Sequence, residues 1–373
     1  MKRRLLKLSI VFLAGIAILV VGAGIYMQQP KFGALPKGEY LEKMKKSPNY
    51  VDGQFVNLTP TPQFREGITT FSATFSFLFK EKIRPAPVQP VPTVKTNLLE
   101  LDKQKDIVIW LGHSSYYMQI GGKSLLVDPV LSESAAPLAF LNRAFAGANP
   151  YNLEDIPEID YLLITHDHWD HLDYPTVTAL KEKTKNVFCP LGVAGYLEQW
   201  GFAREIIYEG DWFDMFEPEQ NFSVTILPAR HFSGRTLERN KTLWAGYAII
   251  TPGRKIFISG DGGYSEHFKQ IGDSFNGFDL AILENGQYDE RWPYVHMTPE
   301  QAAQAAEDLQ AKTVLPAHAG KFSIANHPWD EPFERIAKAC QGKPFKLLTP
   351  MIGQPVELGN EQQSFSHWWE DIK

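Results

Sequence analysis

The sequence predicts an α/β fold built in layers, with a transmembrane helix at its N-terminus. From Asp106 onward, short runs of branched apolar residues are typical of buried strands, and they are bounded by glycine, proline or aspartate. Stretches of good helix formers, such as "TPEQAAQAAEDLQ", lie between some of these runs. Strands and helices therefore alternate, as they do in α/β proteins. Ahead of them, residues 8–27 form an uncharged apolar run.

The N-terminal helix is expected to anchor the chain in a membrane, because the run over residues 8–27 is just long enough to span the hydrocarbon layer. Residues 1–7, "MKRRLLK", form a basic flank that should stay in the cytoplasm. The remainder is then expected on the extracytoplasmic side, in the periplasm or outside the cell. A cleaved signal sequence is the alternative, since "GAG" at residues 22–24 is a passable cleavage site, but the apolar run exceeds the usual length of such sequences.

The next segment, residues 28–100, is expected to be a proline-rich spacer. "QQPKFGALPKGE" and "RPAPVQPVPTV" predict extended chain, whereas "FREGITTFSATFSFLFK" has enough aromatic residues to pack on the main domain. The main domain is expected over residues 101–350, and residues 351–373 are expected to form a C-terminal tail.

The overall composition suits a globular protein, with 44% hydrophobic and 21% charged residues. The net charge of −6 argues against nucleic acid as a partner. Cys189 and Cys340 form no CxxC pair, which argues against a cysteine zinc site. They are expected as buried apolar residues, and the sequence leaves open both a disulfide between them and the oligomeric state.

One short segment concentrates ionisable residues directly after the apolar run "YLLI". It is "THDHWDHLD", from Thr165 to Asp173. Imidazole and carboxylate groups are the ligands that suit Zn²⁺ and its first-row neighbours. A solvated loop with incidental histidines is the alternative, but four such groups within six residues past a strand end favour a metal site. The four are His166, His168, Asp170 and His171.

Three further candidate ligands follow other predicted strands. His231 lies in "PARHFSG", Asp261 in "ISGDGGY" and His318 in "PAHAG". Loops at one end of a sheet lie side by side, so these residues are expected to converge on the first cluster. The two glycines at 262 and 263 are expected to let the backbone turn sharply beside Asp261.

Taken together, these motifs resemble the metallo-β-lactamase-fold hydrolases, and within them the group of phospholipases D that hydrolyse N-acylphosphatidylethanolamine, a relative of the ascorbate-6-phosphate lactonase branch. The resemblance implies a four-layer αβ/βα sandwich and covers about residues 55 to 350. It rests on "WLGHSS" at 110–115, "LLVDPV" at 125–130, "LITHDHWDHLDY" at 163–174, "PARHFSGRTL" at 228–237, "FISGDGGY" at 257–264, "ERWPYVHMTPEQA" at 290–302 and "LPAHAGKFSIANHPWDEP" at 315–332.

The resemblance also implies a binuclear zinc site, although iron or manganese would suit such ligands too. One zinc would be held by His166, His168 and His231, and the other by Asp170, His171 and His318, with Asp261 bridging both. Two cations lower the pKa of a bound water and so supply hydroxide near neutral pH.

Three other residues are expected to support the reaction that the resemblance implies. His296, in "YVHMTPE", matches a family histidine near the reacting group and is expected to donate a proton or a hydrogen bond there. Asp170 would serve catalysis as well as metal binding. Asp128 is expected to orient a ligand imidazole, and His113 to do the same or to be structural.

The expected function is that of a membrane-tethered zinc phosphodiesterase of phospholipase D type, acting on N-acylphosphatidylethanolamine-like phospholipids or other small phosphodiesters. A lactonase or other ester hydrolase is the first alternative. A non-catalytic metal-binding envelope protein is the second, and the complete ligand set argues against it. Aromatic residues beside the ligand motifs are expected to line an apolar acyl channel or to pack around the metal site. They are Trp169, Trp292, Tyr294 and Phe322.

Overall fold

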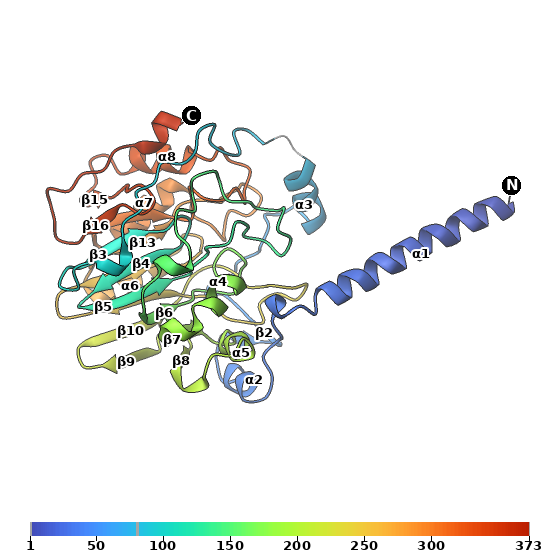
Figure 1. Cartoon of the computed structure of the whole chain (residues 1–373), viewed down its shortest axis with the longest axis horizontal. Helices are drawn as coiled ribbons and strands as arrows, with labels where there is room; N and C mark the ends of the chain where they lie inside the picture. The colour runs from blue at the N-terminus through green and yellow to red at the C-terminus, as the bar shows by residue number, and fades with distance from the viewer. Residues whose placement is uncertain (1, 80–81, 373) are drawn as a thin grey trace.

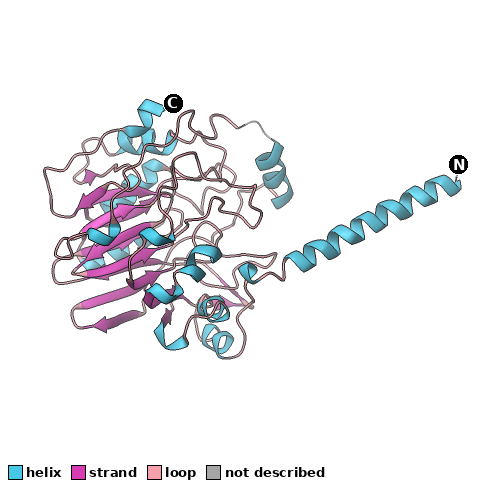
Figure 2. Ribbon diagram, viewed as in Figure 1, coloured by secondary structure: helices cyan, strands magenta, loops and turns pink. Residues whose placement is uncertain are grey.

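The computed structural model of the chain describes residues 2–79 and 82–372. Two seven-stranded sheets face each other, and helices cover their outer faces (Figure 2). The first sheet has the order β15-β14-β13-β12-β11-β10-β9, and the second the order β16-β3-β4-β5-β6-β7-β8. The predicted four-layer metallo-β-lactamase sandwich is therefore confirmed.

The strands are β1 (Tyr50–Val51), β2 (Gln54–Phe55), β3 (Ile107–Trp110), β4 (Tyr116–Ile120), β5 (Lys123–Val127), β6 (Ile159–Leu163), β7 (Thr184–Pro190), β8 (Ile207–Gly210), β9 (Met215–Glu219), β10 (Phe222–Leu227), β11 (Gly246–Ile250), β12 (Lys255–Ile258), β13 (Phe278–Glu284), β14 (Ala311–Ala317), β15 (Lys346–Leu347) and β16 (Pro355–Glu357). The α-helices, labelled in part in Figure 1, are α1 (Lys2–Tyr26), α2 (Glu39–Met44), α3 (Thr70–Phe79), α4 (Tyr174–Ala179), α5 (Ala194–Gln199), α6 (His267–Phe275), α7 (Pro299–Asp308) and α8 (Glu331–Ala339). Short 3₁₀ helices lie at Pro30–Phe32, Leu98–Glu100, Leu153–Asp155, Lys181–Lys183, Arg204–Ile206 and Trp368–Ile372.

The layers follow from the alternation of side chains along each strand. On β4, Tyr116 and Met118 belong to the apolar cluster between the two sheets, whereas Tyr117 belongs to the cluster beneath the helices of the second sheet. On β13, Leu280 faces the space between the sheets and Ala281 faces the helices of the first sheet. Both faces of these strands are buried, which explains why they are continuous apolar runs in the sequence.

The first sheet is covered by α6, α7 and α8. Helix α7 begins with a capping box. The Thr298 side chain accepts a hydrogen bond from the backbone N–H of Gln301, and the Gln301 side chain accepts one from the backbone N–H of Thr298. Its alanines, among them Ala302 and Ala306, lie in the same apolar cluster as Ile336 of α8. Small residues there let α7 pack closely between the sheet and its neighbour. The second sheet is covered by α4 and α5.

Helix α1 extends away from the folded body (Figure 1). Over Lys7–Tyr26 it is long and apolar enough to cross a membrane, and none of this stretch is buried against the body. Its base is fixed to the body, because the hydroxyl of Tyr26 and the ammonium of Lys31 both donate to the carbonyl of Pro137, at 2.6 and 2.8 Å. Its orientation in a membrane and its cleavage stay predictions.

The proline-rich segment 28–100 lies along the body for much of its length. Met44 of α2, Phe55 of β2 and Val91 are buried in the cluster between the sheets. A short hairpin of β1 and β2 adds to this contact, and its Phe55 N–H donates to the carbonyl of Asn240 at 2.8 Å. The segment therefore contributes side chains to the core of the main domain.

The predicted end of the main domain at residue 350 is wrong. Strand β16 pairs antiparallel with β3 and forms the edge of the second sheet, with Val356 opposite Val108. After it, Trp368 and Trp369 are buried, and the Trp369 ring stacks on Phe333 at a centroid distance of 5.3 Å. Residues 351–372 are thus part of the domain and not a tail, because they cover an edge and a face that would otherwise be exposed.

The two cysteines behave as small buried side chains. Cys189 lies within β7 and Cys340 follows α8, and both are free and buried. They belong to two different apolar clusters, one beneath each helical layer, so this structure holds no disulfide between them.

Candidate metal centre

The seven predicted ligands follow strands of both sheets. The turn after β6 carries four of them, and the other three follow β10, β12 and β14. Strands β10 and β12 both run antiparallel to β11, and β12 and β14 both run parallel to β13. Their C-terminal ends therefore lie at one edge of the first sheet, where the turn after β6 meets them.

Three imidazoles form the first group of predicted ligands. His168 Nδ1 lies 2.9 Å from His166 Nε2 and 3.3 Å from His231 Nε2. The other nitrogen of His231, Nδ1, donates to the carbonyl of Val295 at 2.8 Å, which leaves Nε2 without hydrogen and facing the group. Burial lowers the pKa of His166 and His231 well below the usual histidine value, and lowers that of His168 to about 3. All three rings are therefore neutral near pH 7, the form that binds metals.

The second group joins one carboxylate to three imidazoles. Asp170 Oδ2 lies 2.9 Å from His113 Nε2, 3.5 Å from His171 Nε2 and 4.0 Å from His318 Nε2. His113 was expected to orient a ligand or to be structural. It is fully buried and touches the predicted ligand Asp170 directly, so it can hold that carboxylate in place.

The carboxylate of Asp261 lies between the two groups. Its Oδ2 is 3.1 Å from His171 Nε2 and 3.9 Å from both His166 Nε2 and His231 Nε2. Its Oδ1 is 3.1 Å from His318 Nδ1. Burial raises the pKa of Asp261 to about 6, although the neighbouring His171 lowers it. This is the place that a bridging ligand would occupy.

The glycines after Asp261 have a different purpose from the predicted sharp turn, since neither Gly262 nor Gly263 has a positive φ. A Cβ added at Gly262 would lie 2.9 Å from the backbone nitrogen of Arg230, and one at Gly263 would overlap the carbonyl of Tyr294. These positions need glycine because neighbouring backbone passes so close.

Asp128, which follows β5 and was predicted to orient a ligand imidazole, contacts both His171 and the start of the turn after β6. Its carboxylate accepts from the backbone N–H and the hydroxyl of Thr165, at 2.8 and 2.5 Å, and its Oδ2 lies 2.7 Å from His171 Nδ1. The hydrogen on Nδ1 therefore points at Asp128, and Nε2 of His171 faces the ligands.

Arg235 holds the turn from the other side. Its guanidinium donates to the carbonyls of Asp167 and Leu172, at 2.8 and 2.7 Å, and to the carbonyl of Lys31 at 2.8 Å. It also lies 4.1 Å from the ring of Trp169, which packs on Phe32. One buried arginine thus joins the metal-site turn to the segment that follows α1.

One residue was missed by the sequence analysis. Glu284 ends β13, between the strands that lead to Asp261 and His318, and it is fully buried. Its Oε2 lies 2.8 Å from Nδ1 of His296. The sequence did hold a signal, because "LAILE" is an apolar strand that ends in a carboxylate, like those that lead to the predicted ligands.

The geometry of these groups fits metal ions. Zinc–nitrogen bonds of about 2.0–2.1 Å in a tetrahedral site place neighbouring ligand atoms about 3.3 Å apart. The spacings of 2.9 and 3.3 Å among the first three imidazoles are close to that value. In addition, His171 Nε2 and Asp261 Oδ1 are buried, and although each lies 3.1 Å from a neighbouring polar atom, neither makes a hydrogen bond of good geometry among the described residues. Buried polar atoms are seldom left so, and metal coordination would satisfy both.

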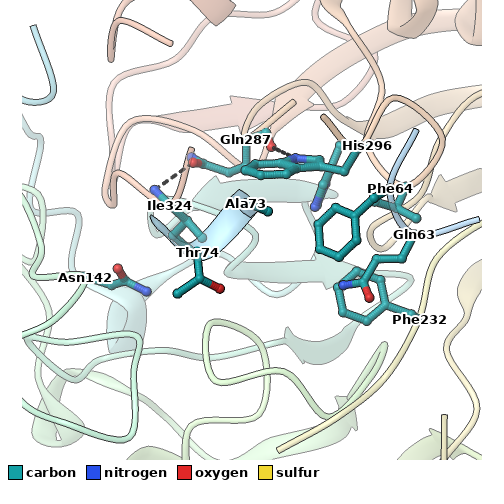
Figure 3. A pocket seen from close by; sticks show the side chains of 11 residues that line it. Gln63, Phe64, Ala73, Thr74, Asn142, Phe232, Gln287, His296 and Ile324 are labelled. Carbon is teal, nitrogen blue, oxygen red and sulfur yellow. Dashed lines mark hydrogen bonds between the residues drawn. The ribbon is translucent and has the colours of Figure 1, made fainter. Parts of the chain in front are cut away.

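A mainly apolar cavity of about 290 Å³ opens beside His296. Figure 3 shows Phe64 and Phe232 on one side of it and Ala73 and Thr74 of α3 on another. His296 also borders a second cavity of about 750 Å³, whose walls carry Arg65, Asp289, Arg291, Glu331 and Arg335. One imidazole therefore lies where an apolar and a polar cavity meet.

Of the four aromatic residues expected in an acyl channel, Trp292 lines the apolar cavity. Trp169 instead packs on Phe32 and Arg235, and Phe322 is buried against His113 at a ring distance of 5.2 Å. Tyr294 packs under the guanidinium of Arg230. Trp169 and Phe322 therefore follow the other alternative, packing around the metal site, because proximity in sequence to a ligand motif does not fix the face to which a side chain points.

Comparisons with known proteins agree with this geometry. The beta-lactamase superfamily domain matches residues 123–319. An uncharacterised protein of Mycobacterium tuberculosis is 36% identical over 329 residues, which are 87% of this chain and 88% of that protein. The outer membrane protein RomA of Klebsiella pneumoniae is 62% identical over 99 residues, which are 26% of this chain and 75% of that protein.

A relative with a named activity is the N-acyl-phosphatidylethanolamine-hydrolyzing phospholipase D 1 of Caenorhabditis elegans. It is 30% identical over 227 residues, which are 58% of this chain and 64% of that protein. Among solved structures, the metallo hydrolase Igni18 of Ignicoccus hospitalis superposes with a TM-score of 0.55 at 20% identity, covering 68% of this chain and 97% of that one. This last likeness concerns the fold alone.

The ligand roles lead to a prediction on metal content. Replacing His168 by alanine (His168→Ala) should weaken metal binding by more than the 10–100-fold typical of residues that only orient a ligand, because it removes the nitrogen common to both short contacts of the first group. Elemental analysis after dialysis against a metal buffer measures this. His367→Ala, at an exposed histidine outside the site, is the control and should keep the full metal content. Equal metal content in the two variants would remove His168 from the ligand set.

Proposed function

This chain belongs to the beta-lactamase superfamily of metal-dependent hydrolases, and we propose that it is a binuclear zinc phosphodiesterase of phospholipase D type. Its proposed substrates are N-acylphosphatidylethanolamine-like phospholipids taken from a membrane. The resemblance to the phospholipase D of Caenorhabditis elegans supports the reaction class.

The observation that carries the proposal is the position of His296. Its imidazole borders an apolar cavity on one side and a charged cavity on the other, and its ring lies 5.0 Å from that of the predicted ligand His231. A phospholipid has the same division, with apolar chains and a charged headgroup joined through a phosphodiester. The apolar cavity would take acyl chain, the charged cavity would take polar groups, and the phosphate would lie beside His296 and the ligands.

The residues of the chain divide the work of hydrolysis. His166, His168 and His231 would hold one zinc, and Asp170, His171 and His318 the other, with Asp261 between them. Bound there, two cations would lower the pKa of a water and neutralise charge on the phosphate. His296 would place a hydrogen bond or a proton on the phosphate or the leaving oxygen. The apolar walls of the first cavity would exclude bulk water from the reacting group and so strengthen these interactions.

Helix α3 supports a membrane source for the substrate. Ala73 and Thr74 line the apolar cavity, whereas Phe71, Phe75 and Phe79 point outward and are 79%, 55% and 70% exposed. These three follow one another at i, i+4 and i+8 and so form one apolar face. Helix α3 also lies on the side of the body from which α1 extends (Figure 1). An apolar helix face next to a membrane anchor fits the interface of a lipid bilayer.

We also propose that α1 anchors the chain, with the folded domain on the extracytoplasmic side. The basic flank of α1 supports this orientation, since such residues stay in the cytoplasm. The name of the RomA relative, an outer membrane protein, is in keeping with an envelope location. A tether of this kind would hold the cavity close to its lipid substrate at a high effective concentration.

A substrate panel tests the reaction. Full-length, zinc-loaded protein in vesicles that contain N-acylphosphatidylethanolamine should release phosphatidic acid and N-acylethanolamine, and mass spectrometry of the lipid extract detects both. Asp170→Asn, which weakens a ligand of one predicted zinc, should lower the rate at least about tenfold. Turnover of lactones or carboxylic esters, with no product from any phosphodiester in the panel, would overturn the phospholipase proposal.

The α3 surface leads to a prediction that separates membrane contact from chemistry. A Phe71→Ser/Phe75→Ser double variant should lose about 1.5–3 kcal/mol of bilayer contact for each phenylalanine that is inserted. The KM for vesicle substrate should therefore rise at least about tenfold, while turnover of the water-soluble bis(p-nitrophenyl) phosphate should not change.

The matched control is Phe213→Ser, which removes another exposed phenylalanine, next to β9 and away from α3. It should leave the kinetics on both substrates as they are. If the α3 variant and this control behave alike on vesicles, the outer face of α3 does not contact the membrane.

A further inference from the structure

We propose that Glu284 is a positioning residue that holds the His296 imidazole with its hydrogen on Nδ1, so that Nε2 is the nitrogen presented to the substrate. The inference rests on the proposed function for the role of His296. It adds a carboxylate–imidazole pair to the metal centre, and it starts from a buried carboxylate that no predicted ligand contacts through a hydrogen bond.

The two oxygens of Glu284 have different partners. Oε1 accepts from the backbone N–H of Met297 at 2.7 Å and from that of Gly262 at 3.3 Å. Oε2 lies 2.8 Å from Nδ1 of His296. The carboxylate is fully buried, and it connects the residue after Asp261 with the loop that carries His296. Its side chain is therefore fixed at both oxygens.

These contacts decide the direction of the bond to His296. Backbone N–H groups only donate, so Oε1 must accept. Burial raises the pKa of Glu284 well above its usual value, and the two N–H groups offset this only in part, whereas cations bound in the neighbouring cluster would favour the carboxylate. With metal bound, Glu284 is therefore proposed as the carboxylate, which has no hydrogen to give, and Nδ1 of His296 is then the donor. In the neutral ring this leaves Nε2 as an acceptor, and in the protonated ring Nε2 carries the hydrogen to be donated.

The position of His296 explains why a fixed tautomer would matter for the reaction. The other nitrogen, Nε2, makes no hydrogen bond within residues 2–79 and 82–372, and the side chain points into the apolar cavity (Figure 3). An imidazole held at one nitrogen loses its freedom to rotate away or to change tautomer. Glu284 thus does for His296 what Asp128 does for His171.

The test is Glu284→Gln, which keeps the size of the side chain. The two backbone N–H groups at Oε1 require the amide oxygen there, which leaves the NH₂ group against Nδ1 of His296. Because that group donates, Nδ1 must accept, and the hydrogen of the neutral ring moves to Nε2. Nitrogen NMR of histidine-labelled protein, with His296→Ala to assign the signals, reads this tautomer directly, in metal-free and in zinc-loaded protein.

Wild-type protein is expected to have the hydrogen on Nδ1 of His296, and Glu284→Gln is expected to have it on Nε2 with an unchanged zinc content. On bis(p-nitrophenyl) phosphate, kcat should fall about 10–100-fold with little change in KM. In a His296→Ala background, Glu284→Gln should lower kcat by less than about a further twofold, because a residue that acts through His296 has nothing left to position.

Glu209→Gln serves as the matched control. Glu209 is a buried carboxylate at β8 that accepts from the backbone N–H of Gly192 at 2.8 Å, and its Oε2 lies 3.5 Å from the Lys43 ammonium. The Glu209→Gln substitution should leave the His296 tautomer and kcat unchanged, whatever its effect on the stability of the fold.

Three results would overturn the inference. The first is a wild-type His296 that carries its hydrogen on Nε2. The second is a loss of zinc in Glu284→Gln, which would make Glu284 a ligand. The third is a fall in kcat caused by Glu284→Gln that is just as large when His296 is already replaced by alanine. The tautomer does not depend on the substrate, so a protein that cleaves only lactones would end the phospholipase proposal and leave this one standing.

Discussion

The arrangement of the site depends on the electrostatics of a buried cluster. Five histidines and two aspartates meet at one edge of the sandwich, and five of these seven residues, all but His168 and Asp170, have less than about 3% of their surface exposed. Carboxylates are costly to bury unless charge or hydrogen bonds compensate them. Burial lowers the pKa values of His166, His168 and His231, so these imidazoles offer lone pairs instead of positive charge. Divalent cations would compensate the carboxylates and use the lone pairs at once.

The fold supplies the rigidity that such a cluster needs. The predicted ligands lie on short loops after strands that have both faces buried, and three residues hold parts of these loops. Asp128 fixes the start of the turn after β6, Arg235 fixes its middle and end, and Glu284 joins the loops of Asp261 and His296. Through the carbonyl of Lys31, Arg235 also extends this support to the segment that follows α1. The site is thereby connected to the base of α1.

Much of this was predictable from the sequence, because ligands leave strong local patterns. The four predicted ligands after β6 occur in one turn, and Asp261 and His318 follow apolar strands of the same kind. Other features depend on packing between distant segments. The residues after 350 have no strong strand pattern, yet β16 completes the second sheet beside β3. Trp169 is beside two ligands in sequence but packs toward Phe32, and the role of Glu284 depends on His296 arriving from another loop.

The proposed chemistry needs two cations held by these seven side chains, and anomalous scattering locates such cations most directly. Crystals of zinc-loaded protein, measured above and below the zinc absorption edge, should give two strong peaks. One should lie among His166, His168 and His231, the other among Asp170, His171 and His318, with the Asp261 carboxylate between them. No peak in this cluster, or a single peak held by Glu284 and His296, would contradict the account.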